Sequence, residues 1–409
     1  MSSTSAKRVL IAGGGIAGLA TGLAFQQRGW GVQVVEQAEA LREVGAGIQI
    51  SPNGMKVLRA LGLEGEILAR GFLPEALEMR LGRSGFRLFR LPIKTQAQYR
   101  WRAPYVHIHR ADLIDILARA LEVRAPGSVR LGAEVEGLSA GGHGLMLQGG
   151  ETIEADVVIA ADGLRSALRT AAFGEQPARF TGMMAWRGTV PVSALQQGER
   201  PPPTACVWAG PGRHVVSYYV AKGQMVNFVG VVEKDASSPE DLDSWRTSGQ
   251  LETALQDFIG WHPTVTKMIQ SAQGLSQWAL FDRPPSTQWV KGPMALVGDA
   301  AHPMLPTFAQ GACQGLEDAW TVATLVHRAE EDINAGLNAY AALRQPRTRA
   351  IQHRAMRNAR DFHHQPGFEQ FRAYGTLWFG GRFLPGVARG RLDEIYRYDA
   401  VAEAESAAI

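Results

Sequence analysis

Three glycines near the start of the chain constrain the possible folds most strongly. Gly13, Gly15 and Gly18 form the pattern G-x-G-x-x-G, between an apolar, β-branched run at 7–14 and a stretch with helical spacing of apolar residues. In a strand–turn–helix unit the first glycine allows the tight turn, the second lets a pyrophosphate approach the backbone, and the third allows close helix–strand packing. With a second apolar strand at 31–37, the pattern predicts a βαβ unit that binds a dinucleotide at the helix N-terminus.

An acidic residue narrows the choice of dinucleotide. Glu36 ends the second predicted strand, 18 positions after Gly18, where a carboxylate can accept hydrogen bonds from a ribose. This favours an unphosphorylated ribose, which means NAD or FAD. A plain NAD dehydrogenase would continue through a complete Rossmann sheet, whereas this chain passes into alternating, turn-punctuated segments. The motif alone leaves the choice open.

The later segments predict a two-part α/β fold. Buried runs at 155–163 and 292–300 each end in a Gly/Asp turn, as parallel strands do, while alternation between 183 and 233 indicates an antiparallel sheet with one polar face. We expect a Rossmann-like FAD- or NAD-binding domain, a mixed parallel sheet with helices, interrupted by an antiparallel-sheet substrate domain. The expected boundaries are 1–75, 104–177 and 279–337 for the first domain, 76–103 and 178–278 for the second, and 338–409 for a C-terminal region that is helical to about His364 and then an irregular tail.

Composition excludes several classes of protein. The 409 residues include only two cysteines, Cys206 and Cys313, which excludes a disulfide framework and a cysteine-rich metal site and fits a reducing compartment. No signal peptide pattern and no apolar run near the ~18 residues of a membrane span are present, so we expect a soluble, cytoplasmic protein. Net charge is only +3. This mild basicity does not indicate a nucleic-acid-binding protein.

Two local clusters have an ordinary interpretation beside a functional one. The basic run at 344–360 is read as a solvated helix face in preference to a nucleic-acid site. His107 and His109 alternate on a predicted strand and share a face, but neither acidic nor cysteine partners accompany them. We therefore expect no metal.

Three widely separated stretches together resemble the class A flavoprotein aromatic hydroxylases, which have the para-hydroxybenzoate hydroxylase fold. They are the glycine pattern with Glu36, the stretch "DVVIAADGLRSALR" at 156–169, and "GDAAHPMLPTFAQGACQGLEDA" at 298–319. The second stretch matches the Asp-Gly fingerprint of the family at Asp162, Gly163, Ser166 and Arg169. The resemblance spans nearly the whole chain. Within the class the sequence looks most like salicylate hydroxylase, 3-hydroxybenzoate 6-hydroxylase and 6-hydroxynicotinate 3-monooxygenase.

The resemblance implies FAD as the bound cofactor and assigns residues to it. Asp299 would bind the ribityl chain, and Pro303 and Pro306 would stiffen the loop beside the flavin. Many family members have Gly-Gln-Gly and a following Asn where this chain has Ala309-Gln310-Gly311 and Cys313. The backbone N–H groups of the new helix would still face the negative edge of reduced flavin. The full set expected to bind FAD is Gly13, Gly15, Gly18, Glu36, Ala46, Gly47, Arg110, Asp162, Asp299, Gly311 and Ala312.

The substrate side is expected on the antiparallel sheet. His214 and Tyr218 have even spacing on a predicted strand, so their side chains project to one face, and they match a His/Tyr pair in the 3-hydroxybenzoate and 6-hydroxynicotinate enzymes. We expect His214 to act as base or hydroxyl acceptor and Tyr218 to orient the substrate. Gln49, Pro306 and Thr307 are expected to line the pocket. His302 is interpreted as a structural histidine, and no carboxylate-binding arginine is identified.

The function implied is hydroxylation of a small aromatic acid by a FAD-dependent monooxygenase that uses O2 and NADH or NADPH, through a flavin C4a-hydroperoxide. Salicylate-type decarboxylative hydroxylation is the first choice, followed by a 3-hydroxybenzoate- or hydroxynicotinate-type reaction. The nicotinamide cofactor would bind transiently, with Arg165 and Arg169 contributing. A flavin dehydrogenase or oxidase without oxygen transfer is the alternative enzyme, and a flavin-binding redox sensor or nucleic-acid-binding protein is the alternative of another class. The protein is expected to be a monomer or homodimer.

Overall fold

The first βαβ unit forms as predicted. The computed structural model describes residues 6–41, 47–234, 247–383 and 385–409. Strand β1 (Arg8–Ala12), helix α1 (Ile16–Gln26) and strand β2 (Gly31–Val35) follow one another, and β1 pairs in parallel with β2 on one side and with β11 on the other. The apolar residues Val9–Ala12 of β1, and Val34 and Val35 of β2, are buried because the sheet is covered on both faces.

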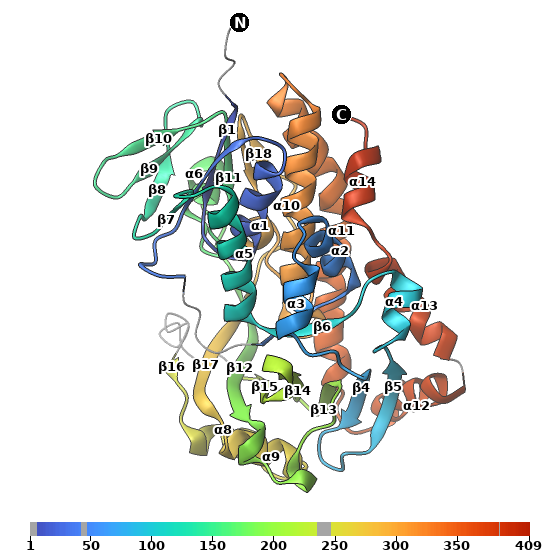
Figure 1. The fold of residues 1–409 in the computed structure, drawn as a ribbon. Coiled ribbons are helices and arrows are strands. Elements are labelled where there is room, and N and C mark those ends of the chain that lie inside the picture. Colours follow the sequence, from blue (N-terminus) through green and yellow to red (C-terminus); the bar gives the residue numbers. More distant parts are fainter. Residues whose placement is uncertain (1–5, 42–46, 235–246, 384) are drawn as a thin grey trace, which may run out of the picture.

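This unit belongs to a six-stranded sheet in the order β18-β19-β11-β1-β2-β7. The pairs are parallel except for the edge strand β18, which is antiparallel to β19. A three-stranded antiparallel sheet, β10-β9-β8, lies at one end of the molecule in Figure 1. The additional strands are β7 (Val129–Arg130), β8 (Val135–Leu138), β9 (Gly144–Leu147), β10 (Thr152–Glu154), β11 (Val157–Ala160), β18 (Val290–Lys291) and β19 (Met294–Leu296).

Helices pack around the six-stranded sheet. Helix α1 packs against both α5 and α10, and α10 lies beside α11 in Figure 1. The bounds are α2 (Pro52–Ala60), α3 (Glu64–Arg70), α4 (Gln96–Trp101), α5 (Arg110–Arg124), α6 (Ala167–Phe173), α10 (Gly311–Arg328) and α11 (Ile333–Phe362). Short 3-10 helices are η1 (Val192–Ala194), η2 (Gln197–Glu199), η3 (Ala221–Gly223), η4 (Gly298–Ala300) and η5 (Pro306–Phe308).

A second, eight-stranded sheet has the order β16-β17-β12-β15-β14-β13-β4-β5 and is antiparallel except for the parallel pair β13–β4. Its strands are β4 (Ala76–Leu81), β5 (Arg87–Pro92), β12 (Arg179–Pro191), β13 (Ala205–Gly210), β14 (Arg213–Val220), β15 (Met225–Glu233), β16 (Thr247–Ser248) and β17 (Gln273–Asp282). A small antiparallel pair, β3 (Gly47–Ile50) with β6 (Val106–His109), lies near it. The predicted fold class, a parallel sheet with helices combined with an antiparallel sheet, is confirmed.

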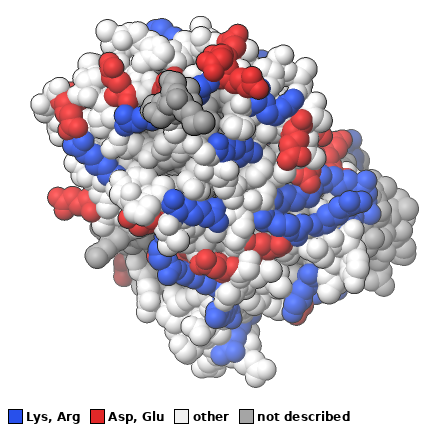
Figure 2. Space-filling view, turned by 45° about the horizontal axis from the view of Figure 1, so that its top comes forward, with Lys and Arg blue, Asp and Glu red and all other residues white. Residues whose placement is uncertain are grey.

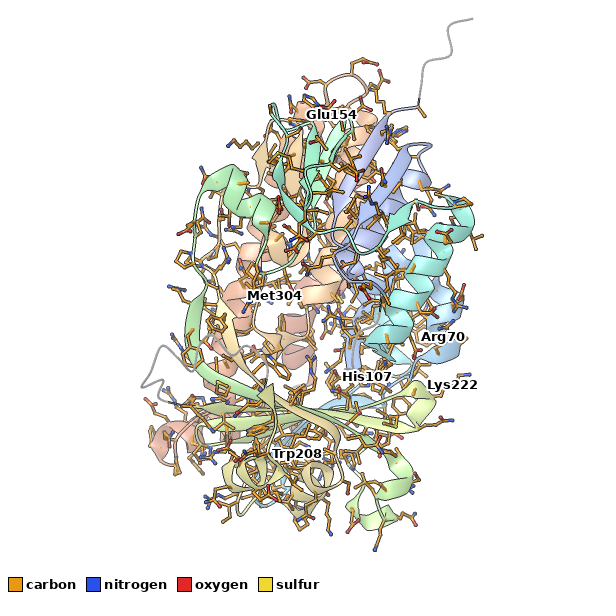
Figure 3. All side chains as sticks on the ribbon, turned by 90° about the vertical axis from the view of Figure 1, so that its left-hand side faces the viewer. Arg70, His107, Glu154, Trp208, Lys222 and Met304 are labelled. Carbon is orange, nitrogen blue, oxygen red and sulfur yellow. The ribbon has the colours of Figure 1, made fainter. Side chains whose placement is uncertain are left out.

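Side-chain alternation gives the large sheet two different faces. Odd-numbered residues of β14, such as Val215 and Tyr219, join Trp186 and Trp208 in an apolar core under helices α8 (Leu251–Asp257) and α9 (Pro263–Gln270). In Figure 3, Trp208 lies on this side of the sheet, whereas Met304 and His107 lie on the opposite side. Because successive side chains of a strand point to opposite faces, the even-numbered residues of β14 face the six-stranded sheet domain.

The C-terminal region departs from the prediction. The segment after His364 is not an irregular tail but contains α12 (Phe368–Phe383), α13 (Pro385–Tyr396) and α14 (Ala400–Ser406). Asp399 caps the N-terminus of α14, where its carboxylate accepts hydrogen bonds from two backbone N–H groups. It buries Ala400 and Ala404, and it packs against α10 and α2. A helix this short forms because it packs on the core, which its own sequence does not reveal.

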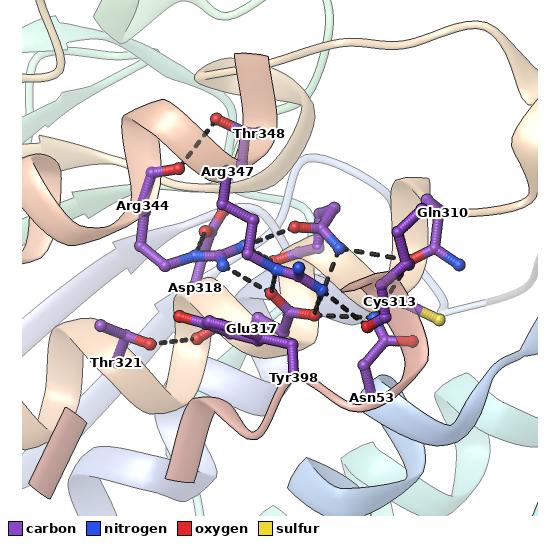
Figure 4. Close-up of polar contacts among 12 residues, drawn as sticks. Asn53, Gln310, Cys313, Glu317, Asp318, Thr321, Arg344, Arg347, Thr348 and Tyr398 are labelled. Atoms are coloured by element: carbon purple, nitrogen blue, oxygen red, sulfur yellow. Dashed lines mark hydrogen bonds and ion pairs between the residues drawn. The ribbon is translucent and has the colours of Figure 1, made fainter. Parts of the chain in front are cut away.

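The basic run at 344–360 is also partly misread. Arg344 is fully buried, and its Nε lies 2.8 Å from Asp318 Oδ1 on α10. Arg347 Nε donates to Glu317 Oε2 at 2.7 Å, so both arginines belong to a buried network between α10 and α11, drawn in Figure 4. Arg349 of the same helix is exposed, as predicted for a solvated face.

The surface visible in Figure 2 carries basic and acidic side chains interspersed over the same area. Within the described ranges, no helix is both long and apolar enough to cross a membrane.

Candidate active site

A cavity of about 770 Å³ lies between the six-stranded sheet and the large antiparallel sheet. Its wall includes the turns that follow β1 and β11, the start of α10, and the inward face of β14. Parallel strands bring the residues after their C-terminal ends to one edge, which is where ligands of such sheets bind. Most of the predicted cofactor and substrate residues therefore line one cavity, although Gly18 and Thr307 do not.

The three glycines have three separate structural roles, as predicted. Gly13 has φ of +107°, and a Cβ there would lie 2.4 Å from the carbonyl oxygen of Ala161. A Cβ on Gly18 would lie 1.9 Å from the Gly13 carbonyl oxygen, so this glycine permits close packing of α1 on β1. A Cβ on Gly15 would meet no atom within 4 Å, and Gly15 lines the cavity. The open backbone at the start of α1 fits a pyrophosphate group.

Glu36 is held rigidly beside this turn. Its Oε2 accepts a hydrogen bond from the backbone N–H of Gly14 at 2.6 Å, and its Oε1 accepts one from Ala38 N–H at 2.9 Å. The residue lines the cavity. A carboxylate fixed in this way keeps further acceptor capacity for ribose hydroxyls.

Asp299 lies in η4, directly after β19, and its side chain is exposed to the cavity. Burial in the surrounding protein raises the pKa of its carboxyl, while the nearby charges of His302 and Arg110 act in the opposite direction. Arg110, at the start of α5, lines the same cavity, as does Asp162 after β11. Desolvation likewise raises the pKa of Asp162, whose Oδ2 accepts from Leu168 N–H at 3.2 Å.

The loop around Asp299 is anchored by Arg169 of the Asp-Gly motif. Arg169 is buried and donates hydrogen bonds to the carbonyl oxygens of Ala300 at 2.8 Å and Ala301 at 3.2 Å. Arg169 therefore supports the loop from behind, and Arg165 is the arginine of that motif that faces the cavity. The expected contribution of this segment to nicotinamide binding stays a prediction.

His302 is structural, as expected, although its anchor is a carboxylate. Its Nε2 is hydrogen-bonded to the buried Asp318, which also accepts from the backbone N–H of Gly298 at 2.9 Å. Burial acts to raise the pKa of Asp318, but His302 and Arg344 lower it to about 2. The carboxylate thus stays charged and fixes both ends of the loop that carries Asp299.

The helix N-terminus predicted to face the flavin does reach the cavity. Gly311, Ala312 and Pro306 line it, whereas Thr307 does not. The Thr307 hydroxyl instead donates to the carbonyl oxygen of Ala355 on α11 at 2.5 Å. Its expected role in the pocket is corrected, because the turn of η5 directs this side chain toward the helix. Cys313 packs inside, and burial raises its thiol pKa to about 11, which fits the inert role expected.

His214, Val216 and Tyr218 line the cavity from β14, as their even spacing predicts. Burial lowers the pKa of His214 well below its ordinary value, and the neighbouring His363 lowers it further, so the imidazole is neutral. Burial raises the pKa of the Tyr218 phenol. A neutral imidazole and a protonated phenol are the forms that accept and donate, respectively, a hydrogen bond to a ligand hydroxyl.

The β3–β6 pair closes this end of the cavity. Gly47 N–H donates to Asn227 Oδ1 at 2.7 Å, and a Cβ at Gly47 would lie 2.6 Å from a ring carbon of Tyr218. Gln49 lines the cavity, with its side-chain oxygen held by the Tyr105 hydroxyl at 2.9 Å. Ala46, expected beside the flavin ring, lies outside the described residues.

His107 and His109 lie on β6. Burial lowers the pKa of His107 to about 3, and its ring packs against the rings of Phe72, Tyr105 and Tyr218. Among the residues that the structure describes, no group of three or more His, Cys, Asp or Glu side chains is placed to hold a metal ion.

Sequence reasoning missed one cation of the cavity and two residues behind His214. Arg187 of β12 lines the cavity, with its guanidinium 4.3 Å from the ring centre of Trp278. It lies in register with Val229 of β15, which in turn pairs with Val216. In the sequence this arginine stands in "WRGTVP" at 186–191, where nothing local marks it. Only the strand register reveals that it shares a face with His214. His363 and Glu233 follow His214 in a hydrogen-bonded row that leads away from the cavity.

Comparison with known proteins agrees with this geometry. Residues 6–355 match the family described as "FAD binding domain". The chain is 38% identical over 371 residues to a 3-amino-4-hydroxybenzoate 2-monooxygenase of Streptomyces platensis, covering 90% of this chain and 91% of that protein. It is 33% identical over 313 residues to a 6-hydroxynicotinate 3-monooxygenase of Pseudomonas fluorescens, covering 76% and 80%. The chain belongs to the FAD-binding hydroxylase family.

Solved structures extend the agreement to the whole fold. Klebsiella pneumoniae HpxO, complexed with FAD and uric acid, superposes with a TM-score of 0.81 at 27% identity and covers 94% of this chain and 97% of its own. A salicylate hydroxylase substrate complex gives 0.80 at 28% identity, covering 98% of both chains. The protein is thus a class A flavin-dependent aromatic monooxygenase with FAD as its cofactor. The resemblance stated from the three motifs is confirmed.

Proposed function

We propose that this monooxygenase hydroxylates a small aromatic acid whose ring hydroxyl lies across the ring from its carboxylate, with NAD(P)H and O2 as co-substrates. The observation that carries the proposal is the placement of His214, Tyr218 and Arg187 on one face of the large sheet, opposite the residues that fit FAD. Bound FAD supplies the activation of oxygen. The protein's own residues bind and orient the aromatic acid and hold its hydroxyl proton.

His214 is the base in this proposal. A phenol reacts much better as its phenolate, so a proton acceptor beside the hydroxyl favours attack by the ring. Because burial keeps His214 neutral, its ring can take the hydroxyl proton without first losing one. Tyr218 lies four residues further along β14, on the same face of the sheet. It orients the aromatic ring and donates a hydrogen bond to the oxygen of the substrate hydroxyl.

Arg187 is proposed to bind the carboxylate. Two strand intervals separate β12 from β14, which is about 10 Å. Arg187 is in register, through Val229 of β15, with Val216 of β14, and His214 lies two residues from Val216 along the strand. A carboxylate and a hydroxyl on opposite sides of one ring span this separation better than neighbouring substituents do. The salicylate-type reaction expected from the motifs therefore ranks second, while the substrates named for the two relatives have the opposed arrangement.

The nicotinamide cofactor is proposed to approach past Arg165, which lines the cavity. The geometry favours neither NADH nor NADPH, so both belong in every assay.

A matched set of variants tests the assignment of His214 and Tyr218. His214→Gln should retain FAD but lose about 10²- to 10⁴-fold in coupled hydroxylation, the usual effect of removing a general base. Tyr218→Phe should raise KM, whereas Tyr219→Phe should leave it unchanged, because Tyr219 faces the other side and donates to the carbonyl oxygen of Pro201. Unchanged turnover of His214→Gln would remove this histidine from the mechanism.

A further inference from the structure

Three ionisable side chains form a continuous hydrogen-bonded row that leads away from the cavity. His214 Nδ1 lies 2.7 Å from His363 Nε2, and His363 Nδ1 lies 2.7 Å from Glu233 Oε1. The row begins at a fully interior residue, since His214 is 1% exposed and His363 is 5% exposed. It ends at the Glu233 side chain, which is 52% exposed.

The row connects two separate hollows. His214 lines the cavity of the candidate active site. Glu233 and His363 line a second cavity of about 490 Å³, together with the segment 364–369. The three side chains come from β14, from the end of β15 and from the residue that follows α11, so a strand pair and a distant helix terminus are brought together at this point.

We propose that His363 and Glu233 carry the substrate's hydroxyl proton between His214 and solvent, with His363 as a positioning residue that relays the proton. This inference rests on the proposed function, in which His214 is the base. In the starting state His214 Nδ1–H donates to His363 Nε2, and His363 Nδ1–H donates to the Glu233 carboxylate.

The transfer conserves protons and leaves no charged imidazole. The substrate O–H proton passes to His214 Nε2, the Nδ1 proton of His214 passes to His363 Nε2, and the Nδ1 proton of His363 passes to Glu233. Glu233 then releases one proton to water. The products are a phenolate in the cavity, one solvated proton and two neutral imidazoles in their other tautomers. Protonation in the reverse direction restores the original tautomers.

The surroundings favour neutral imidazoles. Burial lowers the pKa of His214. Burial is also the largest influence on the pKa of His363 and lowers it. The Glu233 carboxylate acts to raise the pKa of His363, and the Arg213 cation acts to lower it. Phe362 packs edge-on against the His214 ring. A relay that keeps both rings neutral avoids the cost of a buried charge.

The alternative is that the His214–His363 hydrogen bond only links β14 to the end of α11 and carries no proton. The rate of proton release distinguishes this structural role from the relay. FAD-loaded enzyme is mixed anaerobically with 4-hydroxybenzoate or 3-amino-4-hydroxybenzoate in weakly buffered solution that contains a pH indicator. The rate of proton appearance is followed by stopped flow. The variants are His363→Ala, His363→Gln and Glu233→Gln, with His364→Ala as control, because His364 lines the same outer cavity but is not part of the row.

His363→Ala should slow proton release about tenfold or more while the Kd of the aromatic acid stays nearly unchanged. Added imidazole should restore the rate, because the deleted ring borders an open cavity. His363→Gln should be equally slow, since an amide keeps a hydrogen bond but cannot relay a proton, and Glu233→Gln should also be slow. His364→Ala should match the unaltered enzyme.

Two results would overturn the relay. One is proton release by His363→Ala at the rate of the unaltered enzyme. The other is slow proton release by His363→Ala that added imidazole does not restore, together with normal release by His363→Gln. That pair of results would indicate a purely structural role for His363. Failure of the proposed function looks different, because the unaltered enzyme would then bind neither acid or release no proton, and the relay would fall with it.

Discussion

Ala309 stands where many members of the family have glycine, and its backbone shows why glycine is common there. Its φ is +50°, in the left-handed region, at the end of η5 and just before α10, whose first residues line the cavity. For a residue with a Cβ this conformation costs roughly 1–2 kcal/mol. The chain keeps this strain because Pro306 and the start of α10 hold the loop on both sides.

Ala309→Gly should therefore leave stability unchanged or raise it by up to about 1 kcal/mol, because relief of strain outweighs the greater freedom of glycine in the unfolded chain. Ala342→Gly, at an exposed position inside α11, should lower stability by about 1 kcal/mol. Denaturant unfolding of the FAD-loaded protein measures both. Equal destabilisation by the two substitutions would show that Ala309 is not strained.

Single residues differ in how far the sequence predicts them. His214 and Tyr218 were predicted to share a face because strand alternation is a local rule. Arg187 was missed because its neighbours on the same face come from other strands, and register depends on pairing across the sheet. Thr307 was misassigned because the direction of a side chain in a short turn depends on what packs behind it.

At the scale of elements, α10 and α11 are joined by buried charges. Glu317 and Asp318 on α10 face Arg344 and Arg347 on α11, and Asn53 of α2 donates to Glu317 Oε1 at 2.7 Å. Burial acts to raise the pKa of Glu317, but the two arginines lower it overall. Because Asp318 also holds Gly298 and His302, this network supports the loop that carries Asp299.

Arg344→Met should lower the unfolding free energy by about 3–5 kcal/mol, because two buried carboxylates lose the cation that they share. FAD affinity should also fall, since Asp318 would no longer hold the loop as firmly. Arg349→Met, on the exposed side of the same helix, should change neither. Thermal unfolding and FAD titration of both variants test this. Unaltered FAD affinity in a folded Arg344→Met protein would show that the buried charge network does not support FAD binding.

Helical periodicity could have revealed this network in part. Arg344, Thr348, Ile351, Ala355 and Ala359 form one buried stripe of α11 at helical spacing. An arginine at the end of such a stripe looks like an ordinary solvated cation unless its acidic partners are known. Those partners lie 26 and 27 positions earlier in the chain, on a helix whose packing the sequence does not show.

At the scale of the whole molecule, the active site exists only because two sheets face one another. One supplies backbone and carboxylates that fit FAD, and the other supplies His214, Tyr218 and Arg187. The sequence predicted both sheets from the contrast between continuous and alternating apolar strands. It misjudged the C-terminal helices, because α14 depends on packing against α10 and α2.

The central claim is that one atom of O2 enters a para-related aromatic acid bound against the large sheet. The most direct measurement is turnover of the FAD-loaded protein under ¹⁸O2 with NADH or NADPH. The panel is 3-amino-4-hydroxybenzoate, 4-hydroxybenzoate, 6-hydroxynicotinate, 3-hydroxybenzoate and salicylate, with products identified by mass. We expect one labelled oxygen per product, matched by NAD(P)H consumption, with the first three acids preferred. Preference for salicylate would contradict the role of Arg187, and a product without labelled oxygen would contradict the account as a whole.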